Sequence, residues 1–215
     1  ELELRAADGA WIRTIQGMAS GYRGLTWVGD DGQLLTTAST NPTQQQLWSV
    51  SVEGSKASAV GGSGGVWSAA VSRSGQYRVL THQSLEPTTW SVWDGPNQVG
   101  KLRSRAEAPK LIPNVTLTQV TDPASGRTFH ASLVRPHGFD PAQRYPVFLH
   151  VYGGPMHQKV RERRGAFLLA QWFAEQGFIV VSLDGRGTPH RGRAWERVLQ
   201  GRAAEVPLED QVAGL

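Results

Sequence analysis

The chain has 215 residues, of which 39% are hydrophobic and 19% charged, and it contains no cysteine. This length suffices for one ordinary domain or two small ones, each with a buried core. The absence of cysteine excludes a disulfide scaffold, thiolate zinc sites and a cysteine nucleophile. No run approaches the ~20 consecutive apolar residues of a membrane span, and residues 1–7 do not resemble a signal peptide, so we expect a soluble globular chain.

The net charge of +4 is unevenly distributed along the chain. Residues 1–100 carry six basic and eight acidic side chains, whereas residues 101–215 carry sixteen basic and ten acidic ones. A basic half can indicate a nucleic-acid surface. Here the arginines alternate with acidic and apolar residues, and no zinc-finger, helix-turn-helix or RNP spacing accompanies them. We therefore interpret this half as a solvated face or a surface for an acidic segment, and we expect no nucleic-acid binding.

Residues 10–103 consist of short apolar and β-branched runs separated by glycine-rich turn signals, the pattern of an all-β region. The runs lie at 11–15, 24–28, 33–38, 46–52, 66–71, 76–81 and 88–93. The pattern repeats, since Gly32 and Gly75 are 43 residues apart and Trp48 and Trp90 are 42 apart. A four-stranded propeller blade needs about 40–45 residues. The repeat predicts propeller blades, with a small antiparallel sandwich as the alternative; two repeats cannot close a ring of roughly four to eight blades.

Beyond a linker bracketed by Pro109 and Pro113, the pattern becomes that of an α/β domain. Strands are expected at 115–120, 128–134, 147–152 and 178–183, the first two as a hairpin and the last two as buried strands. Between the buried strands, residues 165–176 form an amphipathic segment that Gly177 ends. Its expected apolar side consists of Phe167, Leu168, Trp172 and Phe173. The order strand, helix, strand predicts a parallel crossover.

The ends of the two buried strands are the expected place for chemistry, because ligands of open α/β sheets bind at the carboxyl ends of strands. The first strand runs into Gly153-Gly154-Pro155, a turn that would let the backbone approach a substrate. It would also leave the Tyr152 phenol at the mouth of the sheet, where it could donate a hydrogen bond to a developing oxyanion. The alternative is a plain turn with Tyr152 as a packed aromatic.

The second buried strand ends at Asp184-Gly185-Arg186-Gly187. Asp184 and Arg186 could brace this loop by an ion pair or contact a substrate carboxylate, and we favour bracing. An acidic cluster of Glu205, Glu209 and Asp210 follows near a helix start, where carboxylates favour the helix dipole. We interpret that cluster as structural.

The histidines predict no metal site. His82, His130, His137, His150, His157 and His190 form no i, i+4 pair, and the nearest carboxylates lack metal-ligand spacing. We interpret His150 and His157, on either side of the glycine turn, as structural or exposed residues.

Residues 61–65 satisfy the letters of the G-x-S-x-G motif, with Ser63 in the central place. A nucleophile elbow needs a buried strand before the serine and a helix after it. Here a strand-like run follows instead, so we interpret the segment as a glycine loop between blades and exclude Ser63 as a nucleophile.

Together these motifs resemble the prolyl oligopeptidase family of serine peptidases, particularly its dipeptidyl peptidase IV-like branch. Residues 146–155 are similar to the strand and turn that enter the family's catalytic domain, and residues 178–187 to its next strand and DGRG loop. Residues 205–211 are similar to its E-V-x-D-Q helix start, although two residues between Val206 and Glu209 loosen the spacing. Residues 39–51 and 72–90 resemble its last propeller blades.

The resemblance implies all-β propeller blades in residues 1–105, a linker at 106–114 and the N-terminal part of an α/β-hydrolase catalytic domain in 115–215. It implies a serine exopeptidase that releases N-terminal X-Pro or X-Ala dipeptides through an acyl-enzyme. We expect the nucleophile elbow and the rest of the triad beyond Leu215, and therefore no activity from this segment alone. The alternatives are a segment of an acylaminoacyl-peptidase or a prolyl oligopeptidase, or a non-catalytic propeller module that binds peptides.

The resemblance also implies roles for single residues and partners. Tyr152 would supply the side-chain donor of the oxyanion hole, and Pro155 and Gln158 would lie near the substrate on the leaving-group side. Asp184 and Arg186 would brace the second loop. Peptide substrates and the remainder of its own polypeptide are the implied partners, a homodimer is compatible with the resemblance, and no cofactor or metal is implied. The family includes periplasmic, membrane-anchored and cytosolic members, and we expect a bacterial-type soluble enzyme of the periplasm or cytoplasm.

Overall fold

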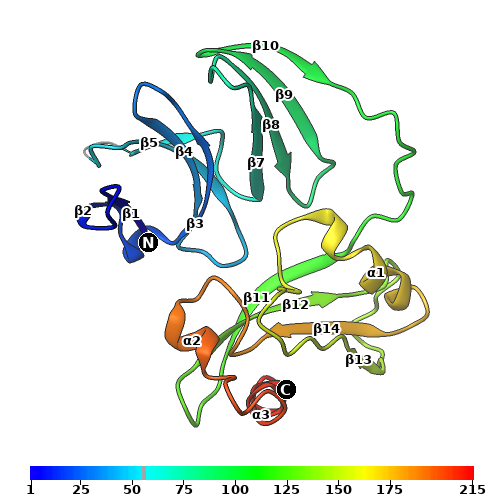
Figure 1. The fold of residues 1–215 in the computed structure, drawn as a ribbon. Coiled ribbons are helices and arrows are strands. Elements are labelled where there is room, and N and C mark those ends of the chain that lie inside the picture. Colours follow the sequence, from blue (N-terminus) through cyan, green and yellow to red (C-terminus); the bar gives the residue numbers. More distant parts are fainter. Residues whose placement is uncertain (55–56) are drawn as a thin grey trace. The chain divides into compact units, whose positions relative to one another are not determined.

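The computed structural model describes residues 1–54 and 57–215, which divide into two compact units (Figure 1). The first unit comprises Glu1–Glu107 and the second Ala108–Leu215. Every sheet lies within one unit or the other. None of the helices in the described ranges is long and apolar enough to cross a membrane.

The first unit holds a hairpin and two four-stranded antiparallel sheets. The hairpin consists of β1 (Leu2–Arg5) and β2 (Trp11–Gln16), followed by a 3-10 turn at Met18–Ser20. The first sheet contains β3 (Tyr22–Val28), β4 (Gln33–Ala38), β5 (Gln46–Ser51) and β6 (Ala57–Val60), and the second β7 (Val66–Val71), β8 (Tyr77–Gln83), β9 (Thr89–Asp94) and β10 (Asn97–Leu102). Each sheet pairs its strands in chain order, which is the arrangement of a propeller blade. The predicted blades are therefore confirmed.

An apolar core joins the two sheets. Leu35 and Leu47 from the first sheet and Leu80 from the second form one buried cluster, against which several tryptophans pack. The Trp27 indole reaches the second sheet, where it donates a hydrogen bond to the Arg73 carbonyl at 3.4 Å. The aromatic spacing of the repeat thus serves the packing between blades.

A backbone bridge adds to this junction. The N–H of Gln45 donates to the Gly65 carbonyl at 3.0 Å, and the N–H of Trp67 donates to the Gln45 carbonyl at 2.8 Å. The bridge is parallel and connects the start of β5 to the start of β7. It satisfies backbone groups where the chain passes from one sheet to the next.

The strands β6 and β10 were not expected from the sequence. β6 consists of alanine, serine and valine, and β10 is almost wholly exposed, so neither carries the β-branched alternation that marks a strand. Both are outer strands that form by pairing with a well-marked neighbour, β5 or β9. Tertiary pairing overrides the weak local signal in both places.

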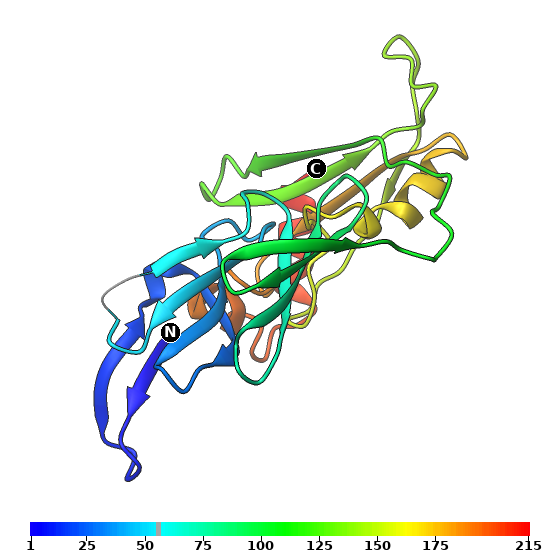
Figure 2. The same ribbon diagram turned by 90° about the horizontal axis from the view of Figure 1, so that it is seen from above.

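The second unit is built on a four-stranded mixed sheet in the order β11-β12-β14-β13. The strands are β11 (Val115–Thr121), β12 (Thr128–Val134), β13 (Val147–Leu149) and β14 (Ile179–Asp184). The helices are a 3-10 turn at Arg164–Ala166, α1 (Leu168–Ala174), α2 (Arg193–Arg197) and α3 (Glu205–Ala213). β11 and β12 form the predicted antiparallel hairpin, whose arrows run in opposite directions in Figure 2, and β13 and β14 are parallel as predicted. This confirms the α/β prediction for this half.

The helix between β13 and β14 differs in detail from its prediction. α1 covers seven residues, and its buried side chains are Ala170, Gln171 and Ala174. Trp172, expected on the apolar side, is 54% exposed and packs its ring against Phe173. The buried Gln171 amide accepts from the Asn114 N–H at 2.6 Å and donates to the Arg135 carbonyl at 3.1 Å, which is why a polar residue occupies the inner face.

Candidate active site

Tyr152 lies three residues beyond the carboxyl end of β13, the strand that pairs in parallel with β14. The ladder continues one residue past β13, because the His150 N–H donates to the Val181 carbonyl at 2.8 Å. Beyond this bond the chain leaves the sheet, and the Tyr152 side chain is half-buried in the turn that follows. The placement at a strand end is the one in which ligands of α/β sheets are bound.

Two glycines fix the form of this turn. A Cβ on Gly154 would lie 2.9 Å from the Tyr152 hydroxyl oxygen, so the phenol folds back over the Gly154 backbone. A Cβ on Gly153 would lie 2.5 Å from the Pro207 Cβ, so this glycine admits the close approach of α3. The His157 and Tyr152 rings are nearly perpendicular, with centroids 5.4 Å apart. The Gly-Gly pair is therefore required by packing on both sides of Tyr152.

Asp184, at the end of β14, braces the chain that follows the turn. One carboxylate oxygen accepts the Lys159 N–H at 2.9 Å and the other accepts the Val160 N–H at 3.0 Å. Asp184 is 2% exposed, and burial raises the pKa of its carboxyl, against the two N–H bonds and the nearby charges of Arg161 and Lys159. The carboxylate thus ties the segment after Tyr152 to the end of the neighbouring strand.

Arg186 takes a partner other than Asp184. Its guanidinium forms an ion pair with Asp210 at 2.7 Å and with Glu209 at 2.8 Å, and its backbone N–H donates to Asp210 as well. The hydrogen bond to Asp210 is the main cause of the raised pKa of Arg186. The two loop residues therefore brace by separate contacts, and the ion pair between Asp184 and Arg186 that the sequence suggested does not form.

Pro155 and Gln158 both lie in the segment that follows Tyr152. Pro155 is exposed, whereas Gln158 is only 4% exposed. The Oε1 atom of Gln158 is buried and has no hydrogen-bond partner among the described residues. A role for these two residues beside a substrate remains a prediction from the family resemblance.

The two histidines that flank the turn differ in their surroundings. Nε2 of His150 lies 2.8 Å from Nζ of Lys159, so a neutral imidazole can accept from the ammonium. Burial, with Lys159 as a second cause, lowers the pKa of His150. The exposed His157 also has a lowered pKa, through partial burial and then the charges of Lys159, Arg163 and Arg161. The pairing of His150 with Lys159 had no signal in the sequence, because the two residues lie nine positions apart across the turn.

Ser63 lies far along the chain from this site, in the link between β6 and β7. Those strands belong to different sheets, and the Trp67 indole donates across the link to the Gly64 carbonyl at 3.1 Å. The element that follows Ser63 is the strand β7 and not a helix, so the segment lacks the strand, turn and helix of a nucleophile elbow.

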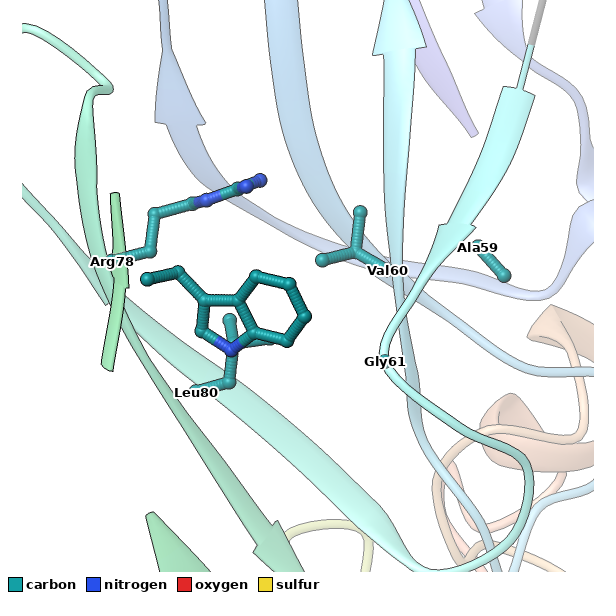
Figure 3. Close-up of a pocket in the computed structure, with 6 residues that line it drawn as sticks. Ala59, Val60, Gly61, Arg78 and Leu80 are labelled. Carbon is teal, nitrogen blue, oxygen red and sulfur yellow. The ribbon is translucent and has the colours of Figure 1, made fainter. Parts of the chain in front are cut away.

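A cavity of about 230 Å³ lies within the first unit. It is lined by Ala59, Val60, Gly61, Arg78, Leu80 and Trp93. Figure 3 shows the guanidinium end of Arg78 directed toward the strand that carries Val60, above Leu80. Nη2 of Arg78 donates to the Gly95 carbonyl. The lining contains no hydroxyl, carboxylate or imidazole, so this cavity offers no group for hydrolysis. In the described part of the chain no three His, Cys, Asp or Glu side chains gather in a way that could hold a metal ion.

Propeller blades followed by a mixed sheet with helices are the fold of proteins that combine a β-propeller with an α/β-hydrolase domain. A crystal structure of Porphyromonas gingivalis dipeptidyl peptidase 4 has this fold and matches 99% of the chain with a TM-score of 0.85 and 22% sequence identity. The match covers 31% of that protein. A dipeptidyl aminopeptidase IV structure from Bacteroides ovatus, described as putative in its own name, gives a TM-score of 0.79.

Comparison of the sequence with known proteins identifies a family model and several relatives that match parts of the chain. The sequence model of the prolyl oligopeptidase family matches residues 166–215. A probable dipeptidyl-aminopeptidase B of Emericella nidulans is 29% identical over 80% of the chain, and human dipeptidyl peptidase 8 is 36% identical over 42% of it. The family model and these relatives thus point to the same family, the prolyl oligopeptidase family, as the one that the chain is similar to. It spans about a fifth of the length of the first of these relatives and a tenth of the second.

Proposed function

We propose that the protein containing this chain is a serine peptidase that removes dipeptides from the amino termini of peptides, with proline or alanine as the second residue. The proposal is supported by the match of residues 166–215 to the family model and by relatives named as a dipeptidyl-aminopeptidase and a dipeptidyl peptidase. The observation that carries it is the position of Tyr152, three residues after the end of β13, in a glycine turn where its phenol lies over the Gly154 backbone.

In this reaction a serine elsewhere in the polypeptide attacks the carbonyl of the second residue, and the amine of the remaining peptide leaves after protonation. The attack places negative charge on the carbonyl oxygen. The Tyr152 hydroxyl donates a hydrogen bond to that oxygen and so stabilises the transition state more than the bound peptide. Water then attacks the acyl-enzyme and releases the dipeptide.

The substrate class is tested with chromogenic anilides of Ala-Pro and Ala-Ala and with the N-acetylated form of Ala-Pro, using the full-length protein. We expect turnover of the two free-amine substrates and loss of turnover on acetylation. Faster turnover of the acetylated substrate would instead identify an acylaminoacyl-peptidase or an endopeptidase. Absence of both turnover and fluorophosphonate labelling would favour a non-catalytic propeller module.

The role of Tyr152 is tested by Tyr152→Phe, which keeps the ring and removes the donor. We expect kcat to fall by roughly 10²–10³ with KM little changed, as for other oxyanion donors. The matched control is Tyr77→Phe in β8, an exposed tyrosine of the first unit, for which we expect unchanged kinetics. A fall of less than threefold for Tyr152→Phe would refute this role.

A further inference from the structure

One face of α3 holds the loops that follow both parallel strands. Pro207, Asp210, Gln211 and Gly214 follow the spacing i, i+3, i+4, i+7, which places them on one side of a helix. Pro207 and Asp210 are buried, Asp210 with only 1% of its surface exposed, and Gln211 and Gly214 are partly buried. The opposite residues Leu208 and Val212 are 65% and 64% exposed. We call these four positions the inner face of α3.

The inner face meets the end of β14 at three of its positions. Asp210 binds Arg186, and a Cβ on Gly185 would lie 2.8 Å from the Asp210 Cβ. Gln211 Nε2 donates to the Leu183 carbonyl at 3.1 Å. A Cβ on Gly214 would lie 2.1 Å from the Leu183 side chain, so only glycine allows this approach. Figure 1 shows α3, in red, near the arrowhead end of β14.

The fourth position of the inner face, Pro207, meets the other loop. It packs against Gly153, next to Tyr152, so closely that a Cβ on Gly153 would lie 2.5 Å from it. One rigid helix turn therefore separates the Arg186–Asp210 ion pair from the turn that carries the phenol. A loop beside a strand end has few backbone bonds of its own, and its position depends on such outside contacts.

We propose that Asp210 and Pro207 are positioning residues for Tyr152. The buried ion pair with Arg186 fixes α3 against the end of β14, and Pro207 transmits that position to Gly153 and so to the phenol. A displacement of about 1 Å in a group that stabilises a transition state can cost on the order of 10²-fold in rate. This inference rests on the proposed role of Tyr152, and the test separates the two.

The first test is a double-mutant cycle of Asp210→Asn with Tyr152→Phe in the full-length protein. Asp210→Asn keeps the shape of the side chain and removes the charge that pairs with Arg186. With Tyr152 present, we expect kcat to fall roughly 10- to 100-fold and KM to change less than threefold. In the Tyr152→Phe background, we expect Asp210→Asn to lower kcat by less than about threefold, because the donor it positions is gone.

Each result of the cycle has a definite meaning. An equal effect of Asp210→Asn in both backgrounds overturns the positioning role and leaves the role of Tyr152 intact. A normal rate for Tyr152→Phe alone refutes the proposed oxyanion donor itself. The matched control on the same helix is Glu205→Gln, which changes only an exposed pair with Arg202 and should leave kcat unchanged. The circular dichroism spectrum and the melting temperature of each variant show whether it is folded.

A steric rescue tests the same link should Asp210→Asn fail to fold. Gly153→Ala drives a methyl group into Pro207 and is expected to lower kcat at least tenfold. Pro207→Gly removes the opposing side chain, so the double variant should recover kcat to within about threefold of Pro207→Gly alone. Independent effects of the two substitutions would show that this contact does not position Tyr152.

Discussion

The two units of the chain are similar in length, but different kinds of internal contact stabilise each of them. In the first unit each sheet pairs strands that follow one another along the chain, and the two sheets meet through a leucine core and a short backbone bridge. In the second unit β14 pairs with β12 and β13 across intervening segments, and α3 contacts residues some 24 to 54 positions earlier. Local repetition thus builds the blades, whereas single long-range contacts build the candidate site.

The two units should therefore respond differently to a substitution. In the blades, stability is spread over a repeated apolar pattern, so one lost methyl group is felt as a cavity. Around the candidate site, single contacts fix the positions of the loops, such as the buried Asp210 carboxylate or Gly153 packed against α3. The loss of one such contact should therefore make a whole loop more mobile.

The largest effect is expected at the ion pair of the second unit. Asp210→Ala leaves the largely buried Arg186 guanidinium without its main partner, and we expect the free energy of unfolding to fall by about 3–5 kcal/mol. Urea unfolding followed by circular dichroism measures the change, and faster hydrogen exchange in residues 183–188 would place it at the loop. Glu205→Ala, which removes only an exposed pair with Arg202, should cost less than about 1 kcal/mol. Equal losses for the two variants would show that the buried Arg186–Asp210 pair stabilises the fold no more than the exposed Arg202–Glu205 pair does.

That contact also marks the limit of prediction from the sequence. The blades, the parallel pair and the place of Tyr152 after β13 follow from local patterns: turn glycines, alternation and apolar runs. The partners of Asp184 and Arg186 do not, because each lies about 24 residues away and is decided by how the chain returns. The sequence analysis interpreted Asp210 only as part of a structural acidic cluster and did not identify the inner face of α3. A stripe of proline, aspartate, glutamine and glycine lacks the apolar character by which a buried face is recognised.

The matching substitution in the first unit is Leu47→Ala. Leu47 is fully buried in the cluster with Leu35 and Leu80, and we expect a loss of about 2–5 kcal/mol from transfer and cavity formation. Guanidinium unfolding followed by tryptophan fluorescence measures this change, since Trp27, Trp67 and Trp93 surround the cluster. The exposed Val99→Ala in β10 serves as the control and should stay within about 0.5 kcal/mol. A loss below 1 kcal/mol for Leu47→Ala would show that the blades do not share this core.

A smaller effect is expected at the turn of the second blade. Gly75 has a φ of +77°, and an added Cβ would lie 2.4 Å from the Trp27 ring. In Gly75→Ala, an alanine must adopt the left-handed conformation, which should lower the free energy of unfolding by about 1–2 kcal/mol. The added methyl group should also displace the Trp27 indole that links the two sheets. Gly95→Ala is the matched control, because Gly95 has a φ of +53° and no atom near an added Cβ. Gly75→Ala should have a lower melting temperature than Gly95→Ala. Identical melting temperatures would show that the Trp27 indole can move aside without loss of stability.

The smallest effect is expected from the titration of His150. Burial and Lys159 lower its pKa in the folded chain below the ordinary value of 6.5, so the unfolded chain takes up the proton first. The stability associated with neutral His150 is complete above pH 6.5 and is lost as the pH falls from there through the folded pKa. Urea unfolding at pH 7.5 and pH 5.5 should thus show a greater loss for the native sequence than for His150→Gln, which cannot be protonated.

Lys159→Met sharpens the same measurement, because it removes the charge that lies 2.8 Å from the ring and keeps an apolar side chain in its place. Since burial is the larger cause of the shift, we expect this variant to keep most of the pH dependence, whereas His150→Gln loses the whole of its share. A native pH dependence in His150→Gln would mean that other groups produce it. A full loss in Lys159→Met would mean that a single ionic contact, as at Asp210, and not burial, governs this end of β13.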